Sequence, residues 1–296
     1  MEYETLSGKN SPSLSFSGSG FLSLYQIGAV KALLDLAPEI LTSAPKVYGA
    51  SAGALVAAAV VLKVNLDRIR RVILDAATEA RKNILGPFFP TFNLLTILRK
   101  ALLNLLPDNA HEVARGRLSI ALTRISDGKN ILVSDFKSKE EVMQALLCSC
   151  FVPFYCGFVP PLFRGVRYID GGFTNFQPFF GFKSIITVSP FTGEIDICPR
   201  DSPVSHLCFQ VFNTSFQLSF ENLCRLSYSL FPPSTAVLND FYCQGYEDAI
   251  FYLISNGKSQ WRFAYPISEK CFTKHKSSKR RAQEMIMRKQ PVELRI

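Results

Sequence analysis

Strand-like and helix-like hydrophobic patterns alternate over most of the chain. Residues 14–17 and 184–188 are short stretches typical of strands, whereas residues 25–36 and 54–62 have apolar positions at helical spacing or in one buried run. Strands that alternate with helices are typical of α/β proteins. The pattern therefore predicts an α/β fold, a three-layer α/β/α sandwich with a mostly parallel central sheet, and it is lost beyond residue 257.

The most specific motif is the G-x-S-x-G pattern Gly49-Ala50-Ser51-Ala52-Gly53, which lies between a strand end and the buried helical run. In that context the pattern is typical of an elbow that exposes a serine hydroxyl for attack on an ester. The two glycines let such a turn close. Ser51 would lie at a helix N-terminus, which favours developing negative charge. The alternative is a small-residue turn that only packs a helix against a sheet.

Two other glycine-bearing loops follow predicted strands. Gly18, Ser19 and Gly20 begin a strand-to-helix loop whose bare N–H groups suit a phosphate or an oxyanion. A dinucleotide site is disfavoured, because Ser23 stands where the third glycine of that motif belongs. The second loop, Asp170-Gly171-Gly172, ends a strand on a carboxylate, and a simple turn is its alternative reading.

The supply of histidines limits the possible mechanisms. Among His111, His206 and His275, the first belongs to a polar helix start and the last to a lysine-rich tail. That leaves His206, whose place after Ser51 and Asp170 matches the Ser, Asp, His order of α/β-hydrolases, although it lies in an irregular loop. Asp170 acting directly as the base for Ser51 needs no histidine. Both a triad and a dyad stay open on these residues.

In these motifs the chain resembles the patatin-like phospholipases, within them the subfamily that contains adipose triglyceride lipase and adiponutrin. The resemblance extends from about residue 12 to residue 257, and its motifs are most similar to those of transacylases that use ω-hydroxyceramide. It rests on residues 18–23, 49–53, 119–130, 148–157, 170–172 and 187–191.

The resemblance implies a Ser-Asp dyad, with Ser51 as nucleophile, Asp170 as base, and Gly18, Ser19 and Gly20 as backbone donors to the oxyanion. It implies a lipid acyl hydrolase or transacylase that acts on long-chain acyl esters such as triacylglycerol, with no cofactor. The implied partners are these lipids, a lipid droplet or membrane surface, and a lipase co-activator protein. The alternative from another class is an unproductive lipid-droplet protein that sequesters a lipase cofactor.

Composition narrows the setting of this chemistry. A chain of 296 residues with 48% hydrophobic content can bury one large core. The N-terminus lacks the regions of a signal peptide, and the eight cysteines show no paired zinc-site spacing, so we expect reduced thiols, no metal and a cytoplasmic protein. The longest apolar run, residues 54–62, falls short of the about 20 residues that a membrane-spanning helix needs. Any attachment to intracellular membranes or droplets is therefore expected to be peripheral.

Charge and aromatic residues indicate two candidate lipid-facing segments. A phenylalanine-rich loop at residues 86–92 precedes a leucine-rich segment at 94–106, which suits either an interface or a buried lid helix. Residues 271–296 carry eight basic and two acidic side chains, hence +6 of the total net charge of +9. This tail suits anionic lipid headgroups. It lacks the aromatic and basic interleaving of a nucleic-acid binder, so we expect no nucleic-acid partner.

The same patterns predict four segments along the chain. Residues 1–12 are expected to be disordered, and residues 13–181 to form the catalytic domain. Residues 182–257 are expected to extend the sheet and pack on that domain. Residues 258–296 are expected to form a variable basic tail.

Overall fold

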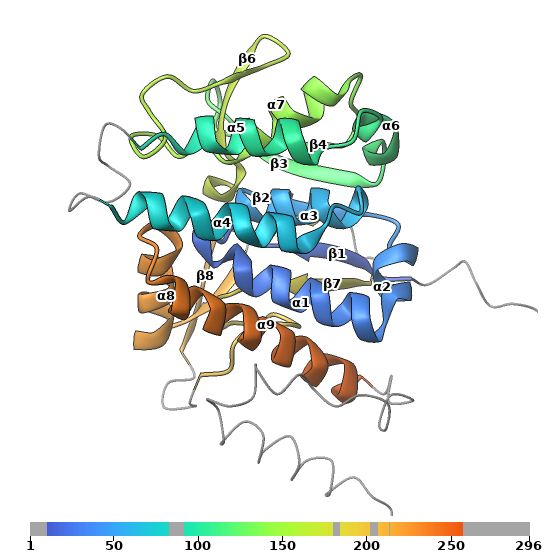
Figure 1. Cartoon of the computed structure of the whole chain (residues 1–296), viewed down its shortest axis with the longest axis vertical. Coiled ribbons are helices and arrows are strands. Elements are labelled where there is room, and N and C mark those ends of the chain that lie inside the picture. The colour runs from blue at the N-terminus through green and yellow to red at the C-terminus, as the bar shows by residue number, and fades with distance from the viewer. Residues whose placement is uncertain (1–10, 83–91, 180–183, 202–206, 213, 257–296) are drawn as a thin grey trace, which may run out of the picture. The chain divides into compact units, whose positions relative to one another are not determined.

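The computed structural model describes residues 11–82, 92–179, 184–201, 207–212 and 214–256 (Figure 1). The chain divides into two units, Met1–Ala249 and Ile250–Ile296. All residues discussed below as parts of the candidate site belong to the first unit. Because the description begins at residue 11 and ends at residue 256, the predicted segment 1–12 falls largely outside it and the predicted segment 258–296 wholly outside it.

The described elements follow one another along the chain in an order in which strands and helices alternate. They are β1 (Ser13–Phe16), η1 (Gly20–Leu22), α1 (Ser23–Leu36), α2 (Pro38–Ser43), β2 (Val47–Ala50), α3 (Ala52–Val61), α4 (Leu66–Ala80), α5 (Leu94–Leu105), α6 (Ala110–Ala114), β3 (Leu118–Arg124), β4 (Asn130–Val133), α7 (Lys139–Ser149), β5 (Leu162–Phe163), β6 (Val166–Asp170), η3 (Gly171–Phe173), β7 (Ile185–Val188), β8 (Cys208–Val211), β9 (Thr214–Gln217), α8 (Phe220–Leu230) and α9 (Thr235–Ser255).

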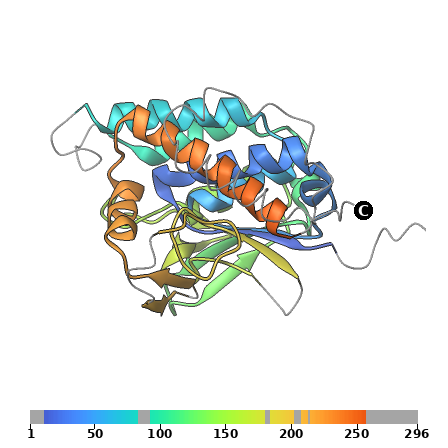
Figure 2. The same cartoon turned by 90° about the horizontal axis from the view of Figure 1, so that it is seen from below.

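A seven-stranded mixed sheet forms the framework. Its strand order is β5-β6-β3-β2-β1-β7, and β4 also pairs with β3. The neighbours β7, β1, β2 and β3 run parallel, whereas β4 and β6 run antiparallel to β3. A separate antiparallel hairpin, β8–β9, lies apart from this sheet (Figure 2). A mostly parallel sheet flanked by helices confirms the predicted α/β class.

The central helix α3 explains how the sheet is covered near the elbow. Its sequence, Ala-Gly-Ala-Leu-Val-Ala-Ala-Ala-Val-Val, has no charged residue, and most of its positions are buried. Small side chains allow the helix to lie close to the strands, and it packs against β1, β2 and β3. Helix α1 packs on α3 in turn. A helix that is apolar all round belongs in a core, so α3 fixes the place of the residue that precedes it.

Side-chain caps fix where several helices begin. The Asn65 side chain accepts hydrogen bonds from the amides of Asp67 and Arg68 at the start of α4, and Asn93 caps α5 in the same way. Ser138 and Ser219 cap α7 and α8. Such caps satisfy amides that have no partner within the helix. They set where these helices begin, and α4, α5 and α8 line the candidate site.

Candidate active site

Ser51 occupies the turn between β2 and α3 in a strained backbone conformation. Its φ is 54° and its ψ is −132°, a region that side chains other than glycine rarely adopt. A Cβ at Gly49 would lie 2.4 Å from the Gly53 carbonyl oxygen, and a Cβ at Gly53 would lie 2.2 Å from the Ser17 carbonyl oxygen. Both positions therefore require glycine, and the turn holds the serine at the N-terminus of α3.

A second serine, Ser149, fixes the elbow by a hydrogen bond to its backbone. The Ser51 amide donates to Ser149 Oγ at 2.9 Å, and the Ser149 hydroxyl donates to the Ala121 carbonyl oxygen at 2.8 Å. Ser149 is the last residue of α7 and is fully buried. It therefore connects α7, the centre of β3 and the elbow. The sequence analysis assigned no role to Ser149, although it lies within residues 148–157, one of the segments that carry the resemblance.

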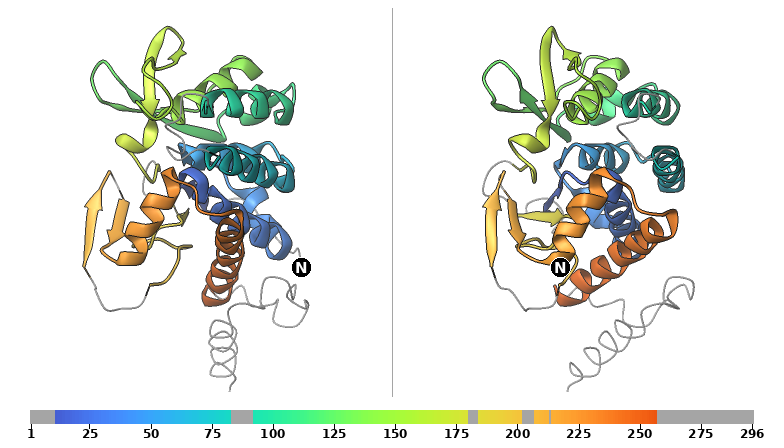
Figure 3. Two further views of the ribbon diagram at one scale, coloured as in Figure 1. Left: turned by 60° about the vertical axis from the view of Figure 1, so that its left-hand side comes forward. Right: turned by 90° about the vertical axis from the view of Figure 1, so that its left-hand side faces the viewer.

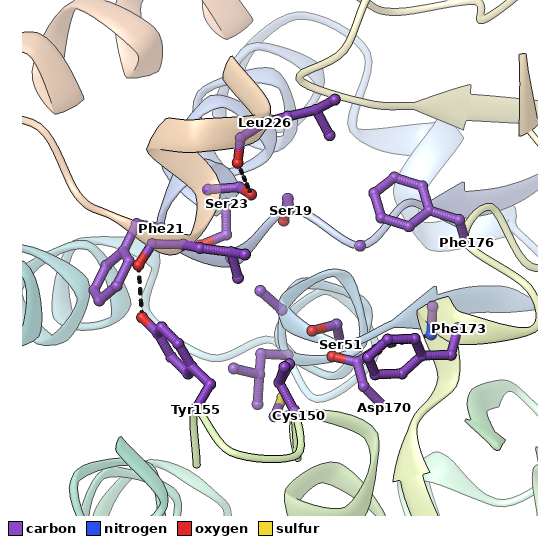
Figure 4. Close-up of a pocket in the computed structure, with 18 of the residues that line it drawn as sticks. Ser19, Phe21, Ser23, Ser51, Cys150, Tyr155, Asp170, Phe173, Phe176 and Leu226 are labelled. Atoms are coloured by element: carbon purple, nitrogen blue, oxygen red, sulfur yellow. Dashed lines mark hydrogen bonds between the residues drawn. The ribbon is translucent and has the colours of Figure 1, made fainter. Parts of the chain in front are cut away.

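The register of β3 brings Ser51 and Asp170 together. Ala50, the last residue of β2, pairs with Ala121, and Asp170, the last residue of β6, pairs with Leu122. Strands β2 and β6 therefore end opposite consecutive residues of β3. Figure 4 shows the Ser51 and Asp170 side chains pointing toward one another at the cavity. The structure therefore juxtaposes the two residues of the expected dyad.

Asp170 is a buried carboxylate with a raised pKa. Only 5% of its surface is exposed, and burial raises its pKa from 3.8 to about 6. A side-chain hydrogen bond from Ser51 and the Gly172 amide, at 2.7 Å from Oδ1, oppose part of this rise. Gly171 and Gly172 belong to η3, directly after the strand. A pKa near 6 leaves Asp170 mostly ionised at neutral pH yet basic enough to take a proton.

The glycine-rich loop lies at the cavity but does not offer all three expected amides. The Gly18 amide donates to the Phe176 carbonyl oxygen at 2.9 Å, so this N–H is already engaged. Within the described part of the chain, the amides of Ser19 and Gly20 have no hydrogen-bond partner. Gly20 has a φ of 50°, and a Cβ there would meet the Ser229 carbonyl oxygen. The expectation of three donors is thereby reduced to Ser19 and Gly20.

Ser23 departs from the glycine that ends this loop in related motifs. It is the first residue of α1. It therefore begins a helix and does not belong to the turn that presents the amides.

An apolar cavity of about 470 Å³ opens over Ser51 and Asp170. Aromatic and aliphatic side chains from α3, α4, α5, α8, η3 and the β8–β9 hairpin dominate its walls. Among the described residues that line it, none is lysine, arginine or histidine. Its apolar lining includes Phe21, Leu55, Val72, Ile73, Leu94, Leu98, Phe173, Phe176, Phe209, Phe212, Phe216, Leu226 and Leu230.

Cys150 also lines the cavity, but its environment makes it a poor nucleophile. Burial raises the pKa of its thiol well above the usual value, and the nearby charge of Asp170 adds to this rise. The thiolate is the reactive form of cysteine. At neutral pH Cys150 therefore stays protonated, and Ser51 is the candidate nucleophile at this end of the cavity.

The structure describes only one of the three histidines. His111 lies in α6, which packs against α7, and it does not line the cavity. His206 and His275 lie outside the described residues. Within the described ranges, no three His, Cys, Asp or Glu side chains are grouped as a metal site would require.

The expected lipid-facing segments are only partly described. Helix α5 packs against α4 and α7, its Leu94 and Leu98 line the cavity, and Leu102 is buried. Much of the apolar side of α5 thus faces inward. Residues 86–91 and the basic tail lie outside the described residues. Among the helices that the structure describes, none combines the length and apolar character needed to cross a membrane.

These observations place the chain among α/β proteins that carry a strand–serine–helix elbow beside a buried aspartate. The family profile of patatin-like phospholipase matches residues 14–182, and the chain belongs to this family. This confirms the resemblance that the motifs indicated.

Three relatives from Homo sapiens show similar levels of identity. The chain is 50% identical to omega-hydroxyceramide transacylase over 241 residues, which are 81% of this chain and 45% of that protein. It is 48% identical to patatin-like phospholipase domain-containing protein 2, over 82% of this chain and 48% of that protein. It is 46% identical to a 1-acylglycerol-3-phosphate O-acyltransferase, over 83% of this chain and 51% of that protein. The chain thus spans about half the length of the curated relatives it matches.

Proposed function

We propose that this protein is a serine lipid acyl hydrolase or transacylase that cleaves long-chain acyl esters through Ser51 and Asp170. The single observation that carries the proposal is the juxtaposition of the Ser51 elbow and the buried Asp170 carboxylate beside a large apolar cavity. Family membership and the enzymatic names of the relatives support it.

The proposed reaction begins with proton transfer from Ser51 Oγ to the Asp170 carboxylate while Oγ attacks the acyl carbonyl carbon. The tetrahedral intermediate then collapses, the C–O bond to the alcohol breaks, and Asp170 returns its proton to the leaving oxygen. This leaves an acyl ester on Ser51. Water or an acceptor alcohol next gives its proton to Asp170 and attacks the carbonyl carbon of this ester. The bond between the acyl carbon and Ser51 Oγ then breaks, the fatty acid or the new ester leaves, and Asp170 returns the proton to Ser51 Oγ.

The backbone around the cavity supplies electrostatic stabilisation for the intermediate. The amides of Ser19 and Gly20 are the candidate donors to the oxyanion, since the Gly18 amide is engaged with Phe176. The N-terminus of α3 adds a favourable field at Ser51. Removing one oxyanion donor typically costs about 2.7–4 kcal/mol in the transition state.

The lining of the cavity favours neutral long-chain acyl esters as substrates. An apolar wall suits fatty acyl chains, and a phosphate near Ser51 would meet the Asp170 charge without a lysine, arginine or histidine among the described lining residues. Triacylglycerol as acyl donor, and water or ω-hydroxyceramide as acceptor, fit this lining. The acceptor matches the name of the relative omega-hydroxyceramide transacylase. Peripheral association with lipid droplets or intracellular membranes, aided by a lipase co-activator, belongs to the same proposal.

Product identification tests this function. The protein is incubated with triacylglycerol labelled in its acyl chains, with and without ω-hydroxyceramide, and the products are separated and identified. We expect free fatty acid, or acylceramide when the acceptor is present, from the wild type and neither product from Ser51→Ala. Turnover by a correctly folded Ser51→Ala variant equal to that of the wild type would refute the proposal.

A further inference from the structure

Helix α8 is amphipathic, but its apolar side faces outward. Phe220 is 76% exposed and Leu223 is 62% exposed, and the same side continues at three- and four-residue spacing. We call this side the α8 face. It consists of Phe220, Leu223, Leu226, Leu230 and the following Phe231.

Two polar residues of α8, Asn222 and Arg225, are buried. Both terminal nitrogens of Arg225 hydrogen-bond to the Asp201 carboxylate, at 2.6 and 2.9 Å, and Arg225 also donates to Thr192 Oγ1. The Asn222 side chain accepts from the Thr192 amide and donates to the carbonyl oxygens of Thr192 and Gln217. The buried side of the helix is therefore a satisfied polar network.

This network fixes the orientation of the helix. Rotating the apolar side inward would expose or separate a buried bidentate ion pair and leave Asn222 without its three partners. Breaking a buried ion pair is strongly destabilising, because a charge is left without compensation. The exposure of the α8 face is therefore a stable property of the fold. Contiguous exposed apolar surface of this kind usually marks a binding surface.

The α8 face is continuous with the candidate active-site cavity. Leu226 and Leu230 belong to the face and also line the cavity. The β8–β9 hairpin lies beside α8 (Figure 3), and its partly exposed Phe209 and Phe212 line the cavity as well. The Tyr155 hydroxyl bonds to the Leu230 carbonyl oxygen at 2.7 Å and ties the end of the helix to the opposite wall. An apolar path thus leads from the surface to Ser51.

The charges on α8 indicate what kind of surface the face fits. None of the five residues of the face is charged, and the charged residues of α8 are Glu221 at its first turn and the buried Arg225. An anionic surface would attract exposed lysine or arginine, which this face does not offer. An uncharged, apolar surface with zwitterionic headgroups is the better match.

We propose that the α8 face docks on the phospholipid-coated surface of a neutral-lipid droplet and delivers acyl esters from it into the cavity. The proposal rests on the proposed function, because delivery is meaningful only if Ser51 acts on such esters. Docking by this face requires apolar insertion and no lysine-rich segment. It therefore assigns to α8 a role distinct from that expected of residues 86–92 and the basic tail.

Flotation of the full-length chain with phosphatidylcholine-coated triolein emulsions tests the proposal. The test variant is Phe220→Gln/Leu223→Gln, since neither residue lines the cavity. The matched control is Leu34→Gln/Ile125→Gln, two side chains outside α8 that are 47% and 45% exposed. Turnover of a short soluble ester, circular dichroism and sedimentation velocity are measured on each protein, and Ser51→Ala is floated beside them.

We expect the fraction of the test variant bound to the emulsion to be at least roughly tenfold lower than that of the wild type. Its turnover of the soluble ester should be retained. The control and Ser51→Ala should float like the wild type, in low and in high salt. Equal flotation of test variant and wild type, or loss of wild-type flotation in high salt, would overturn the proposal. If the wild type sediments as a dimer and the test variant as a monomer, the α8 face would instead bind a second copy of the chain. Flotation without any ester turnover would refute the proposed function while leaving the docking face intact.

Discussion

Replacing Asp170 by asparagine removes a carboxyl group that the fold holds in an unfavourable environment. Burial raises its pKa from 3.8 to about 6, so the folded protein retains a proton between these pH values that the unfolded chain releases. The contribution of this group to the free energy of unfolding is therefore greatest below about pH 4 and decreases as the pH rises through about 6. Asparagine has no such dependence.

The magnitude follows from the difference between the two pKa values. A shift from 3.8 to about 6 corresponds to about 3 kcal/mol of lost stability once the carboxyl group is ionised in both states. Asp170→Asn keeps an oxygen that can accept the Gly172 amide hydrogen bond, so the packing at this point is preserved. The variant should thus be more stable than the wild type by up to about 3 kcal/mol near pH 8, and by close to nothing near pH 4.

Urea unfolding at a series of pH values measures this difference directly. The same variant should lose acyl turnover, and kcat/KM of the wild type should rise with pH through an apparent pKa of about 6. The exposed Asp240→Asn serves as the control and should show neither effect. A free-energy difference between Asp170→Asn and the wild type that is independent of pH would show that burial does not raise the Asp170 pKa, and the account of the base would fail.

Three further perturbations test the surroundings of the dyad. Gly53→Ala places a Cβ 2.2 Å from the Ser17 carbonyl oxygen and should lower the free energy of unfolding in urea by about 3 kcal/mol or more. A decrease of less than about 1 kcal/mol would contradict the tight packing of the elbow. Ser149→Ala leaves the Ser51 amide without its acceptor and should lower both kcat and stability, the latter by about 1–3 kcal/mol; unchanged kcat would exclude a positioning role. Single alanine variants of His111, His206 and His275 should each keep most of the acyl turnover. Loss of turnover in one folded variant alone would replace the dyad by a triad.

Local sequence patterns were sufficient for the elements that carry the candidate site. The G-x-S-x-G motif predicted a serine between a strand and a buried helix, which the structure shows as β2, Ser51 and α3. Asp170 was expected at a strand end, and it is the last residue of β6. These predictions succeed because strand ends, glycine turns and apolar runs are determined by neighbours in the sequence.

Features that depend on distant residues could not be predicted. Ser149 and Ser51 are 98 positions apart, and the Gly18 amide meets the Phe176 carbonyl oxygen only after the sheet forms. Amphipathicity alone would have turned the apolar side of helix α8 inward. The orientation of α8 depends on the ion pair of its Arg225 with Asp201, which lies 24 positions earlier in the sequence. Long-range polar contacts therefore decide the details of the site that local patterns leave open.

Covalent labelling with a long-chain fluorophosphonate, followed by peptide mass spectrometry, tests the central claim most directly. The probe reacts with an activated serine and stops at a stable adduct, so the mapped residue identifies the nucleophile. We expect one adduct at Ser51 in the wild type, none in Ser51→Ala, and much slower labelling in Asp170→Asn. An adduct on any other residue, or labelling of Ser51→Ala at the wild-type rate, would contradict the assignment of Ser51 and Asp170 as the reacting pair.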